Sequence, residues 1–300
     1  MIDLIKFIGY IFFRNKNLNT LFMQVSFLVI TAVIFVIGLY SATNARIINY
    51  QVNINKHAKV DSLRIVQLSD IHVNETTSPQ FIKNIVEQTN SLNPDYIFIT
   101  GDTLDLRLQP YLDKNVPELF SHLTPKYSTF IIFGNHEHYG IYYEKNNEEE
   151  QVIKAFEDSK MQVLKDSVYY DNRTGVYIVG RDDRVIETFG LTRESLDSLL
   201  LFSDKNKSLI LMDHQPKDLR EPQELDIDLM FSGHTHAGQI FPVTLIVQWL
   251  YQNAWGEYKN NTESEFTSIV TSGYGLWGPP IRLMSVAEIV VVDVTFKSSN

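Results

Sequence analysis

The stretch Met230–Gln239 contains the residues whose types and spacing most clearly favour metal chemistry. An apolar run ends there in two histidines one residue apart, with Gly233 and Gly238 on either side. Residues one apart on an extended strand point to opposite faces, so His234 and His236 can converge only where the glycines let the backbone turn. Two converging imidazoles suit a metal ion, and the alternative for this stretch alone is two surface histidines in a turn.

Four other apolar runs end in residues of the same kinds. In chain order these ends are Asp70-Ile-His72, Gly101-Asp102-Thr-Leu-Asp105, Gly134-Asn135-His136-Glu137-His138 and Asp213-His214. Each run is short and rich in β-branched or aromatic residues, which predicts a buried strand. Ligands of open α/β sheets bind outside the carboxyl ends of the strands, where loops bring several segments together. We therefore expect these side chains to share one site.

The number of potential ligands exceeds the needs of one metal ion. They are Asp70, His72, Asp102, Asn135, His214, His234 and His236. Two divalent ions about 3.5–4 Å apart stabilise both the attacking and the leaving oxygen of a phosphoryl displacement, and they need a shared carboxylate, for which Asp102 is the candidate. The sequence has no cysteine, so the ligands supply oxygen and nitrogen, a set that suits Mn, Fe and Zn alike.

The elements that must position these residues alternate between strands and helices. The strands that lead into the candidate site are expected at Arg64–Asp70, Asp95–Thr100, Thr129–Phe133, Ser208–Met212 and Asp226–Phe231. Helices are expected after Ser78-Pro79, within Tyr143–Lys160 and within Thr192–Phe202. Three short runs, Met161–Leu164, Ser167–Tyr170 and Val176–Gly180, predict an antiparallel addition that forms a second sheet, and Ser268–Thr271 and Ala287–Thr295 predict closing strands.

Composition sets the broad class of the protein. The chain has 300 residues, of which 44% are hydrophobic and 21% charged, as is usual for a folded protein of one or two domains. Its net charge of -10 argues against a nucleic-acid partner, because nucleic-acid-binding surfaces carry a basic excess. No feature of the sequence predicts an obligate protein partner.

The N-terminal region differs from the rest of the chain. Residues 21–40 carry no charge and match the ~20 residues that span a bilayer as a helix. We expect residues 1–20 to be a cytoplasmic or interfacial segment, 21–40 an uncleaved transmembrane anchor, 41–61 a linker and 62–297 the folded domain. A cleavable signal peptide ending near Thr43-Asn44-Ala45 is the alternative.

Charges flanking residues 21–40 bear on orientation. Lys6, Arg14 and Lys16 precede this segment and Arg46 follows it, so the positive-inside rule favours a cytoplasmic N-terminus and an extracytoplasmic catalytic domain on a single-pass protein. Leu4–Phe13 is apolar but too short to span a bilayer; it would lie in the interface or help to form a hairpin that reverses the orientation.

The ordered motifs resemble those of the calcineurin-like metallophosphoesterases. The chain has D-x-H, G-D-x-x-D, G-N-H-E, a lone histidine after a strand and G-H-x-H, between Arg64 and Phe296. The resemblance implies an α/β (α+β) fold in which two mixed β-sheets pack as a sandwich flanked by helices. It also implies two sets of metal ligands. One ion would take Asp70, His72, Asp102 and His236, and the other Asp102, Asn135, His214 and His234.

The resemblance also implies a reaction. A metal-bridging hydroxide would attack phosphorus in line, and His136 would hydrogen-bond the leaving oxygen and help to protonate it, a role suited to imidazole. The alternative for His136 is a structural role beside the ligands. Asp105 and Glu137 would orient ligands without binding metal.

Two further stretches resemble the small bacterial membrane-associated branch of that family. One is Gly-His-Thr-His-Ala-Gly-Gln239, in which Ala237 replaces the usual glycine and fits the turn if its φ is negative. The other is Gly278-Pro-Pro-Ile-Arg282. Arg282 is a candidate for binding a substrate phosphate, and the alternative is a surface arginine that packs on its own loop.

These features predict a membrane-anchored phosphoesterase that uses two divalent ions and acts on a small-molecule or lipid-linked phosphate ester. One alternative is a UDP-diacylglucosamine-type lipid pyrophosphate hydrolase, whose cytoplasmic substrate conflicts with the predicted orientation. The other is a metal-binding scaffold of the same fold without catalysis. The intact ligand set argues against the scaffold.

The stretch Phe241–Tyr251 follows the histidine loop directly and contains no charged residue. We expect a helix that buries one face on the sheet, as helices do in this fold class. Its apolar residues cover more of the circumference than one buried stripe needs. The competing hypothesis therefore places its outer face in the lipid interface, with Trp249 and Tyr251 at headgroup level.

Overall fold

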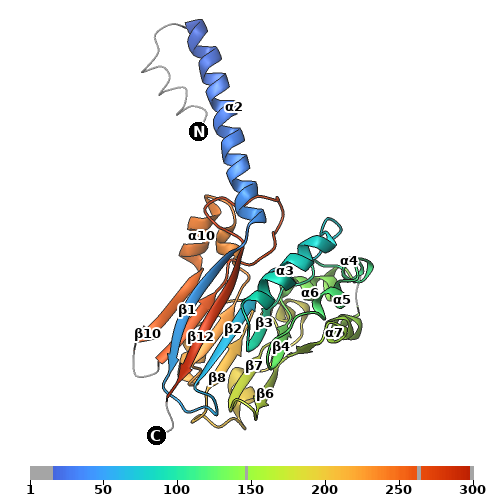
Figure 1. Cartoon of the computed structure of the whole chain (residues 1–300), viewed down its shortest axis with the longest axis vertical. Coiled ribbons are helices and arrows are strands. Elements are labelled where there is room, and N and C mark those ends of the chain that lie inside the picture. The colour runs from blue at the N-terminus through green and yellow to red at the C-terminus, as the bar shows by residue number, and fades with distance from the viewer. Residues whose placement is uncertain (1–15, 146–147, 262–264, 298–300) are drawn as a thin grey trace.

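The computed structural model describes residues 16–145, 148–261 and 265–297, which form two mixed six-stranded sheets packed face to face (Figure 1). The first sheet has the order β1 (Arg46–Ile54), β12 (Glu288–Phe296), β2 (Ser62–Leu68), β3 (Tyr96–Thr100), β4 (Ser128–Ile132) and β5 (Met161–Val163). The second has the order β10 (Gly256–Asn261), β11 (Glu265–Val270), β9 (Leu229–Ser232), β8 (Leu209–Met212), β7 (Val176–Gly180) and β6 (Ser167–Asp171). The expected sandwich of mixed sheets is confirmed.

Helices cover the outer faces of the sandwich. The first sheet carries α3 (Pro79–Ser91), α4 (Gln109–Asp113), α5 (Val116–Phe120) and α7 (Glu149–Asp158), and the second carries α8 (Leu196–Leu200) and α9 (Arg220–Glu224). Helix α3 begins as predicted, because the Ser78 side chain accepts the backbone N–H of Phe81 and Pro79 occupies the first turn. It buries Ile82 and Ile85 against the first sheet.

The core between the sheets is built from aromatic and β-branched side chains. Phe98 and Phe130 from the first sheet meet Phe231 from the second, and the Phe98 and Phe231 rings pack edge to face with centroids 5.3 Å apart. All three side chains are fully buried. Because burying a phenylalanine contributes roughly 1.5–3 kcal/mol, this layer fixes the two sheets relative to each other.

Strand direction brings the ends of both sheets to one edge. Strands β2, β3 and β4 are mutually parallel, as are β7, β8 and β9. Strand β12 is antiparallel to β2 and parallel to β1. The carboxyl ends of the site-bearing strands and the start of β1 therefore share one edge, which we call the carboxyl edge.

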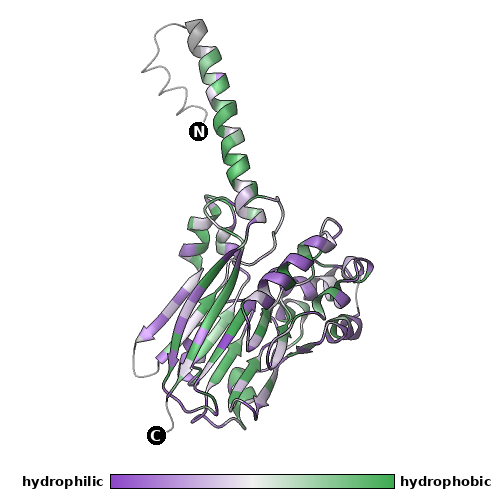
Figure 2. Ribbon diagram, viewed as in Figure 1, coloured by the Kyte–Doolittle hydropathy of each residue, from purple (hydrophilic) through white to green (hydrophobic). Residues whose placement is uncertain are grey.

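Helix α2 (Lys16–Thr43) leads into β1 at this edge. Within the part of the chain that the structure describes, its segment Thr20–Thr43 is the one helix long and apolar enough to cross a membrane. In Figure 2 the mostly apolar ribbon of α2 extends away from the sandwich. The N-terminal segment predicted to lie in the interface falls within residues 1–15, outside the described residues.

Three expectations about local structure are wrong. The predicted linker 41–61 contains strand β1, in which Ile48, Tyr50, Val52 and Ile54 face the inter-sheet core. Strand β5 extends the first sheet and not the second. Helix α10 (Val243–Leu250) does not bury a stripe on a sheet, since Thr244 is its one buried residue.

Candidate metal centre

Every predicted ligand lies just beyond a strand at the carboxyl edge. Asp70 and His72 follow β2, Asp102 follows β3, Asn135 and His136 follow β4, His214 follows β8, and His234 and His236 follow β9. The structure brings all eight side chains into one contiguous cluster. The parallel strands thus bring the strand-end side chains together, as the sequence predicted, and the loops set the individual contacts.

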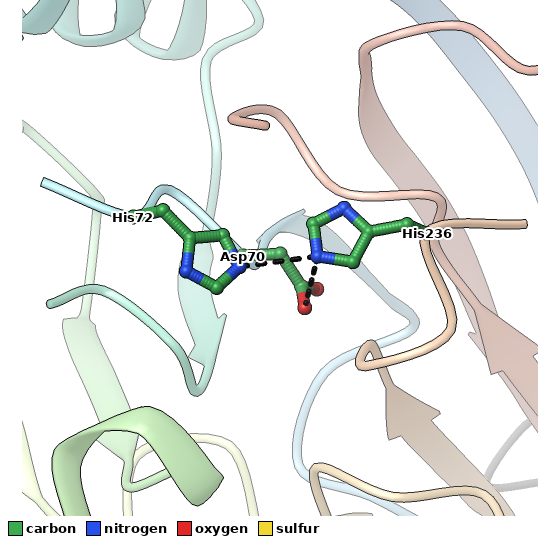
Figure 3. Close-up of side chains that lie close together, drawn as sticks. All are labelled: Asp70, His72 and His236. Carbon is green, nitrogen blue, oxygen red and sulfur yellow. Dashed lines mark hydrogen bonds and ion pairs between the residues drawn. The ribbon is translucent and has the colours of Figure 1, made fainter. Parts of the chain in front are cut away.

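One group of ligand atoms belongs to Asp70, His72 and His236 (Figure 3). The Nε2 atoms of His72 and His236 face each other at 3.1 Å, and the His236 Nε2 lies 3.4 Å from Asp70 Oδ1. Nitrogen and carboxylate oxygen atoms converging at these distances are suited to a divalent cation. The donor set therefore fits one metal ion.

A second group consists of Asp102, His214 and His234, with Asn135 among them. The His214 Nε2 lies 3.2 Å from Asp102 Oδ2 and 3.2 Å from Asn135 Oδ1. Asn135 Oδ1 also lies 2.8 Å from the His234 Nδ1. This set supplies two nitrogens and two oxygens and fits a second ion.

Asp102 lies between the two groups. Its Oδ2 is 3.2 Å from the His214 Nε2 and 3.9 Å from the His72 Nε2, so one carboxylate faces both sets. No lysine or arginine of the described residues forms an ion pair with Asp70 or Asp102. Two buried carboxylates that have only histidines as ion-pair partners favour the binding of metal cations.

Hydrogen bonds from outside the ligand set orient these groups. The His214 Nδ1–H donates to the Thr100 carbonyl at 2.7 Å, which leaves the Nε2 lone pair for a metal. The buried Glu137 carboxylate accepts the backbone N–H groups of Asp102, Leu104 and Gly134 at 2.8–3.0 Å. Glu137 therefore ties the β3 and β4 loops together.

The ligand loops adopt a backbone that L-residues rarely use. Asp70, His72 and Asp102 each have φ of 52°, and His234 has 69°. Such left-handed residues cost energy and gather at functional sites. Ala237 also has a positive φ, 49°, so the condition that its φ be negative is not met and the alanine carries strain that glycine would avoid.

Two glycines are required by close approach. A Cβ on Gly134 would lie 2.2 Å from Asp102 Oδ1, and one on Gly233 would lie 2.3 Å from Asp70 Oδ2. Any side chain at either position would displace a ligand carboxylate. The two glycines thus let the β4 and β9 loops come within contact of the carboxylates that follow β2 and β3.

In the metal-free site, the histidines differ in the direction in which their pKa values are shifted. Burial would lower the pKa of His214, but Asp102 and Asp70 outweigh it and hold this pKa well above its usual range. Burial, together with the nearby His214, lowers the pKa of His234 to about 3. Burial and His72 likewise hold the pKa of His236 well below normal. Neutral imidazoles are the form that binds metal.

His136 is placed differently from the ligands. Its Nδ1 lies 3.1 Å from Asp105 Oδ1, and its backbone N–H donates to Asp102 Oδ1 at 2.9 Å. Burial would lower its pKa, but Asp102 and the hydrogen bond to Asp105 raise it to about 9. Its side chain lines a cavity of about 410 Å³, which also contains Asp102, Asn135 and His234.

The prediction that Arg282 binds substrate is wrong. Its side chain is fully buried and does not line the cavity. The guanidinium donates to the backbone carbonyls of Ser272, Gly273, Gly275 and Val286 and to Ser285 Oγ. These bonds use the donors a phosphate would need, so Arg282 holds its own loop in shape.

The sequence analysis did not identify Tyr139, Gln239 or Trp277 as cavity residues, yet all three line it. The Tyr139 ring lies 6.0 Å from the His136 ring. Gln239 donates to the Trp277 carbonyl at 2.7 Å and accepts its N–H at 2.9 Å. Tyr139 directly follows the Gly134–His138 motif and Gln239 ends the histidine-loop motif, and these positions were the available signal.

Comparison with known proteins bears on this site. The sequence model of the calcineurin-like phosphoesterase domain matches residues 63–238. This chain belongs to that family. The matched range begins in β2 and ends in the histidine loop, so it contains all the proposed ligands.

Relatives agree with this assignment. An uncharacterized metallophosphoesterase of Helicobacter pylori strain 26695 is 30% identical over 97% of this chain and 75% of its own length. One from strain J99 is 32% identical over 79% of this chain, and the aligned part spans 60% of that protein. A zebrafish protein named as a transmembrane protein with a metallophosphoesterase domain is 31% identical over 87% of this chain and 60% of its own length. The relatives thus include proteins longer than this one.

Proposed function

We propose that this protein is a membrane-anchored phosphoesterase that uses two divalent metal ions. The observation that carries the proposal is the position of Asp102, whose carboxylate faces one histidine of each ligand group at the base of the cavity. One ion would be held by Asp70, His72, Asp102 and His236, and the other by Asp102, Asn135, His214 and His234. Mn, Fe and Zn all suit these ligands.

Bound ions would supply Lewis acidity, lowering the pKa of water and taking up charge on phosphate oxygens. The protein's own contribution is orientation and proton transfer. Glu137 fixes the Asp102 and Gly134 backbones, and Thr100 fixes the His214 ring. The ligand geometry is therefore set by the fold before a substrate arrives.

His136 is the residue proposed to protonate the leaving oxygen. It faces the cavity and is outside both proposed ligand sets. Asp105 accepts from its Nδ1, so its Nε2 is directed elsewhere and would carry the proton to be donated. A protonated imidazole beside an alkoxide leaving group is a general acid, a role worth roughly 10²–10⁴ in rate.

The catalytic domain is proposed to lie outside the cytoplasm, held by α2. Support comes from the length and composition of Thr20–Thr43 and from the basic residues that precede it. A reporter active only in the cytoplasm, fused after Asn300, should be silent, while an exported reporter should be active. Activity of the cytoplasmic reporter would show that the catalytic domain lies in the cytoplasm. UDP-diacylglucosamine would then again be a substrate candidate.

The reaction is tested with purified full-length protein in detergent. Protein loaded with Mn, Fe or Zn is assayed on p-nitrophenyl phosphate, bis-p-nitrophenyl phosphate and UDP-diacylglucosamine. We expect turnover of at least one phosphate ester, loss on chelation and recovery on adding metal. A variant with the exposed histidine changed, His122→Asn, is the matched control and should behave as the wild type. Two bound metals without turnover of any substrate would identify the scaffold.

A further inference from the structure

Helix α10 exposes an apolar surface directly beside the metal centre. Four of its side chains are more than half exposed: Trp249 at 84%, Leu250 at 61%, Leu245 at 53% and Ile246 at 52%. Residues 238–256 contain no Asp, Glu, Lys or Arg. Exposed apolar surface on this scale marks an interaction site.

The loop at residues 275–284 extends the same surface. Trp277 and Met284 are exposed, at 58% and 75%, and residues 275–281 carry no charge. Gln239 bonds to the carbonyls of Trp277 and Pro279, and Leu283 exchanges backbone hydrogen bonds with Gln239 and Phe241. We call α10 and this loop together the apolar rim.

The apolar rim is fixed to the metal loop. A Cβ on Gly238 would lie 2.5 Å from the Thr244 backbone, so the first turn of α10 packs directly on the histidine loop. The Ser285 hydroxyl donates to the His236 carbonyl at 3.0 Å. The rim therefore has a set position relative to the metal ligands.

The apolar rim is also fixed to the end of α2. The Arg282 N–H donates to the Gly38 carbonyl at 3.0 Å, and the Ala287 N–H donates to the Ser41 carbonyl at 3.1 Å. In Figure 1, α10 and the lower end of α2 both lie at the carboxyl edge. Helix Thr20–Thr43 is ~36 Å long at 1.5 Å per residue, which exceeds the ~30 Å hydrocarbon core, so its last turn reaches the headgroup layer.

The cavity opens between the metal ligands and the apolar rim. Its lining includes Asp102, Asn135 and His136 from the metal site and the apolar side chains of Ile240, Val243, Val247, Trp277 and Pro279. A phosphate bound at the metal site would therefore share the cavity with apolar side chains. This arrangement fits an amphiphile better than a fully hydrated phosphate ester.

From these contacts we propose that the apolar rim lies in the headgroup layer of the bilayer that α2 spans, and that the site acts on a phosphate ester of a lipid in that leaflet. The rim favours lipid over a protein partner because it is hydrogen-bonded to the end of the membrane helix, its one charged residue is buried, and it exposes two tryptophans, which prefer the interface. The substrate part of the proposal rests on the proposed function, whereas the position of the rim does not.

Lipid contact is tested without catalysis. Full-length protein carrying Trp255→Phe and Trp277→Phe keeps Trp249 as its one tryptophan and is reconstituted into vesicles with or without brominated phosphatidylcholine. Trp249 emission should be quenched by the brominated lipid. In the matched control, all three tryptophans are phenylalanine and Phe202→Trp places the reporter at another exposed apolar site, 91% exposed, before β8. Its emission should be unaffected, and unquenched Trp249 would overturn the proposal.

The substrate class is tested by changing Leu245, Ile246, Trp249 and Leu250 to Gln together, since none of them lines the cavity. Wild-type protein and variant in vesicles are assayed on dioleoyl phosphatidic acid and p-nitrophenyl phosphate. The ratio of lipid to soluble turnover should fall roughly tenfold or more, because the rim would lose most of its apolar area. The control Leu201→Gln/Phe202→Gln should keep the ratio.

An unchanged ratio in the four-residue variant would overturn the lipid-substrate part. If the metal-loaded wild type turns over no ester while Trp249 is quenched, the proposed function fails and the lipid-substrate part falls with it, while the bilayer contact stands. Trp249 that stays unquenched in vesicles because a copurifying protein covers the rim would assign the rim to a protein partner instead.

Discussion

The sandwich buries carboxylates both at the carboxyl edge and at the opposite edge, where β3 and β9 begin and which we call the amino edge, but the partners of these carboxylates differ. At the amino edge, Asp171 binds Arg173 and accepts the Tyr96 hydroxyl at 2.7 Å, and Asp228 lies 3.0 Å from Lys56. At the carboxyl edge, Asp70 and Asp102 face histidines instead of lysine or arginine. The chain pairs its buried carboxylates with lysine or arginine at the amino edge only.

Within one fold, this difference distinguishes carboxylates that stabilise the structure from carboxylates that are placed to bind metal. Lysine or arginine pairs with the buried carboxylates of the amino edge, whereas Asp70 and Asp102 have only histidines beside them until a metal binds. Sites of that kind lower stability and are retained for activity. The comparison therefore predicts that Asp70→Asn and Asp171→Asn change the free energy of unfolding in opposite directions.

The largest expected effect is at Asp102. Asp102→Ala removes the carboxylate that faces both histidine groups, so activity should be abolished and the metal content should fall. Elemental analysis of purified protein gives the metal-to-chain ratio, and p-nitrophenyl phosphate turnover gives the rate. Retention of two metals per chain would show that Asp102 does not bridge them.

His136→Asn should lower the rate by roughly 10²–10⁴ while metal content stays at the wild-type level. The loss arises because Asn cannot donate a proton to the leaving oxygen. It should be smaller for p-nitrophenyl esters, whose leaving group needs no proton, than for alkyl esters. Equal losses on both would mean that His136 only supports the ligand loops.

The ligand ends were predictable because each combines two local signals. A β-branched run such as Arg64–Asp70 predicts a buried strand, and a carboxylate or imidazole directly after it is conspicuous. Strand β1 also carried a signal, since Ile48, Tyr50, Val52 and Ile54 alternate with polar residues, but asparagine and the nearby membrane segment favoured a linker. Its pairing with β12 is a long-range contact that local pattern does not reveal.

Arg282 and α10 were not predictable for a different reason. The guanidinium of Arg282 donates mainly to backbone carbonyls, and such contacts have no signature in a sequence. The apolar residues of Phe241–Tyr251 indicated burial, because solvent-exposed apolar helices are unusual in globular proteins. What surrounds an apolar face is a property of the whole assembly, so composition alone left both hypotheses open.

At the amino edge we predict a pH dependence of stability. Burial raises the pKa of Asp228 to about 6 in spite of Lys56. The folded-state pKa thus lies above the unfolded value, so this group's contribution to the free energy of unfolding is greatest below about pH 4. It should fall by about 3 kcal/mol as the pH rises through 6.

Asp228→Asn should remove this part of the slope, measured by denaturant unfolding of metal-free protein between pH 4 and 7.5. Asp226→Asn, at a half-exposed neighbour, is the matched control and should keep it. A wild-type slope in Asp228→Asn would show that the buried carboxyl does not change its protonation in this range.

The smallest expected effect is that of Asp70→Asn on stability. Unlike most substitutions, it should raise the free energy of unfolding. Burial, with Asp102 nearby, raises the pKa of Asp70, so the ionised form is disfavoured in the metal-free fold. Asp70→Asn keeps an oxygen for the His234 N–H, which donates to the carboxylate at 3.0 Å, and removes the charge. The metal-free variant should therefore unfold with a free energy about 1 kcal/mol higher than the wild type, yet bind less metal.

At the amino edge, Asp171→Asn loses its pairing with Arg173 and should lower the free energy of unfolding by about 1–3 kcal/mol. Denaturant unfolding of both variants at pH 8 measures the contrast, and destabilisation by Asp70→Asn as large as that by Asp171→Asn would show that both edges are balanced alike.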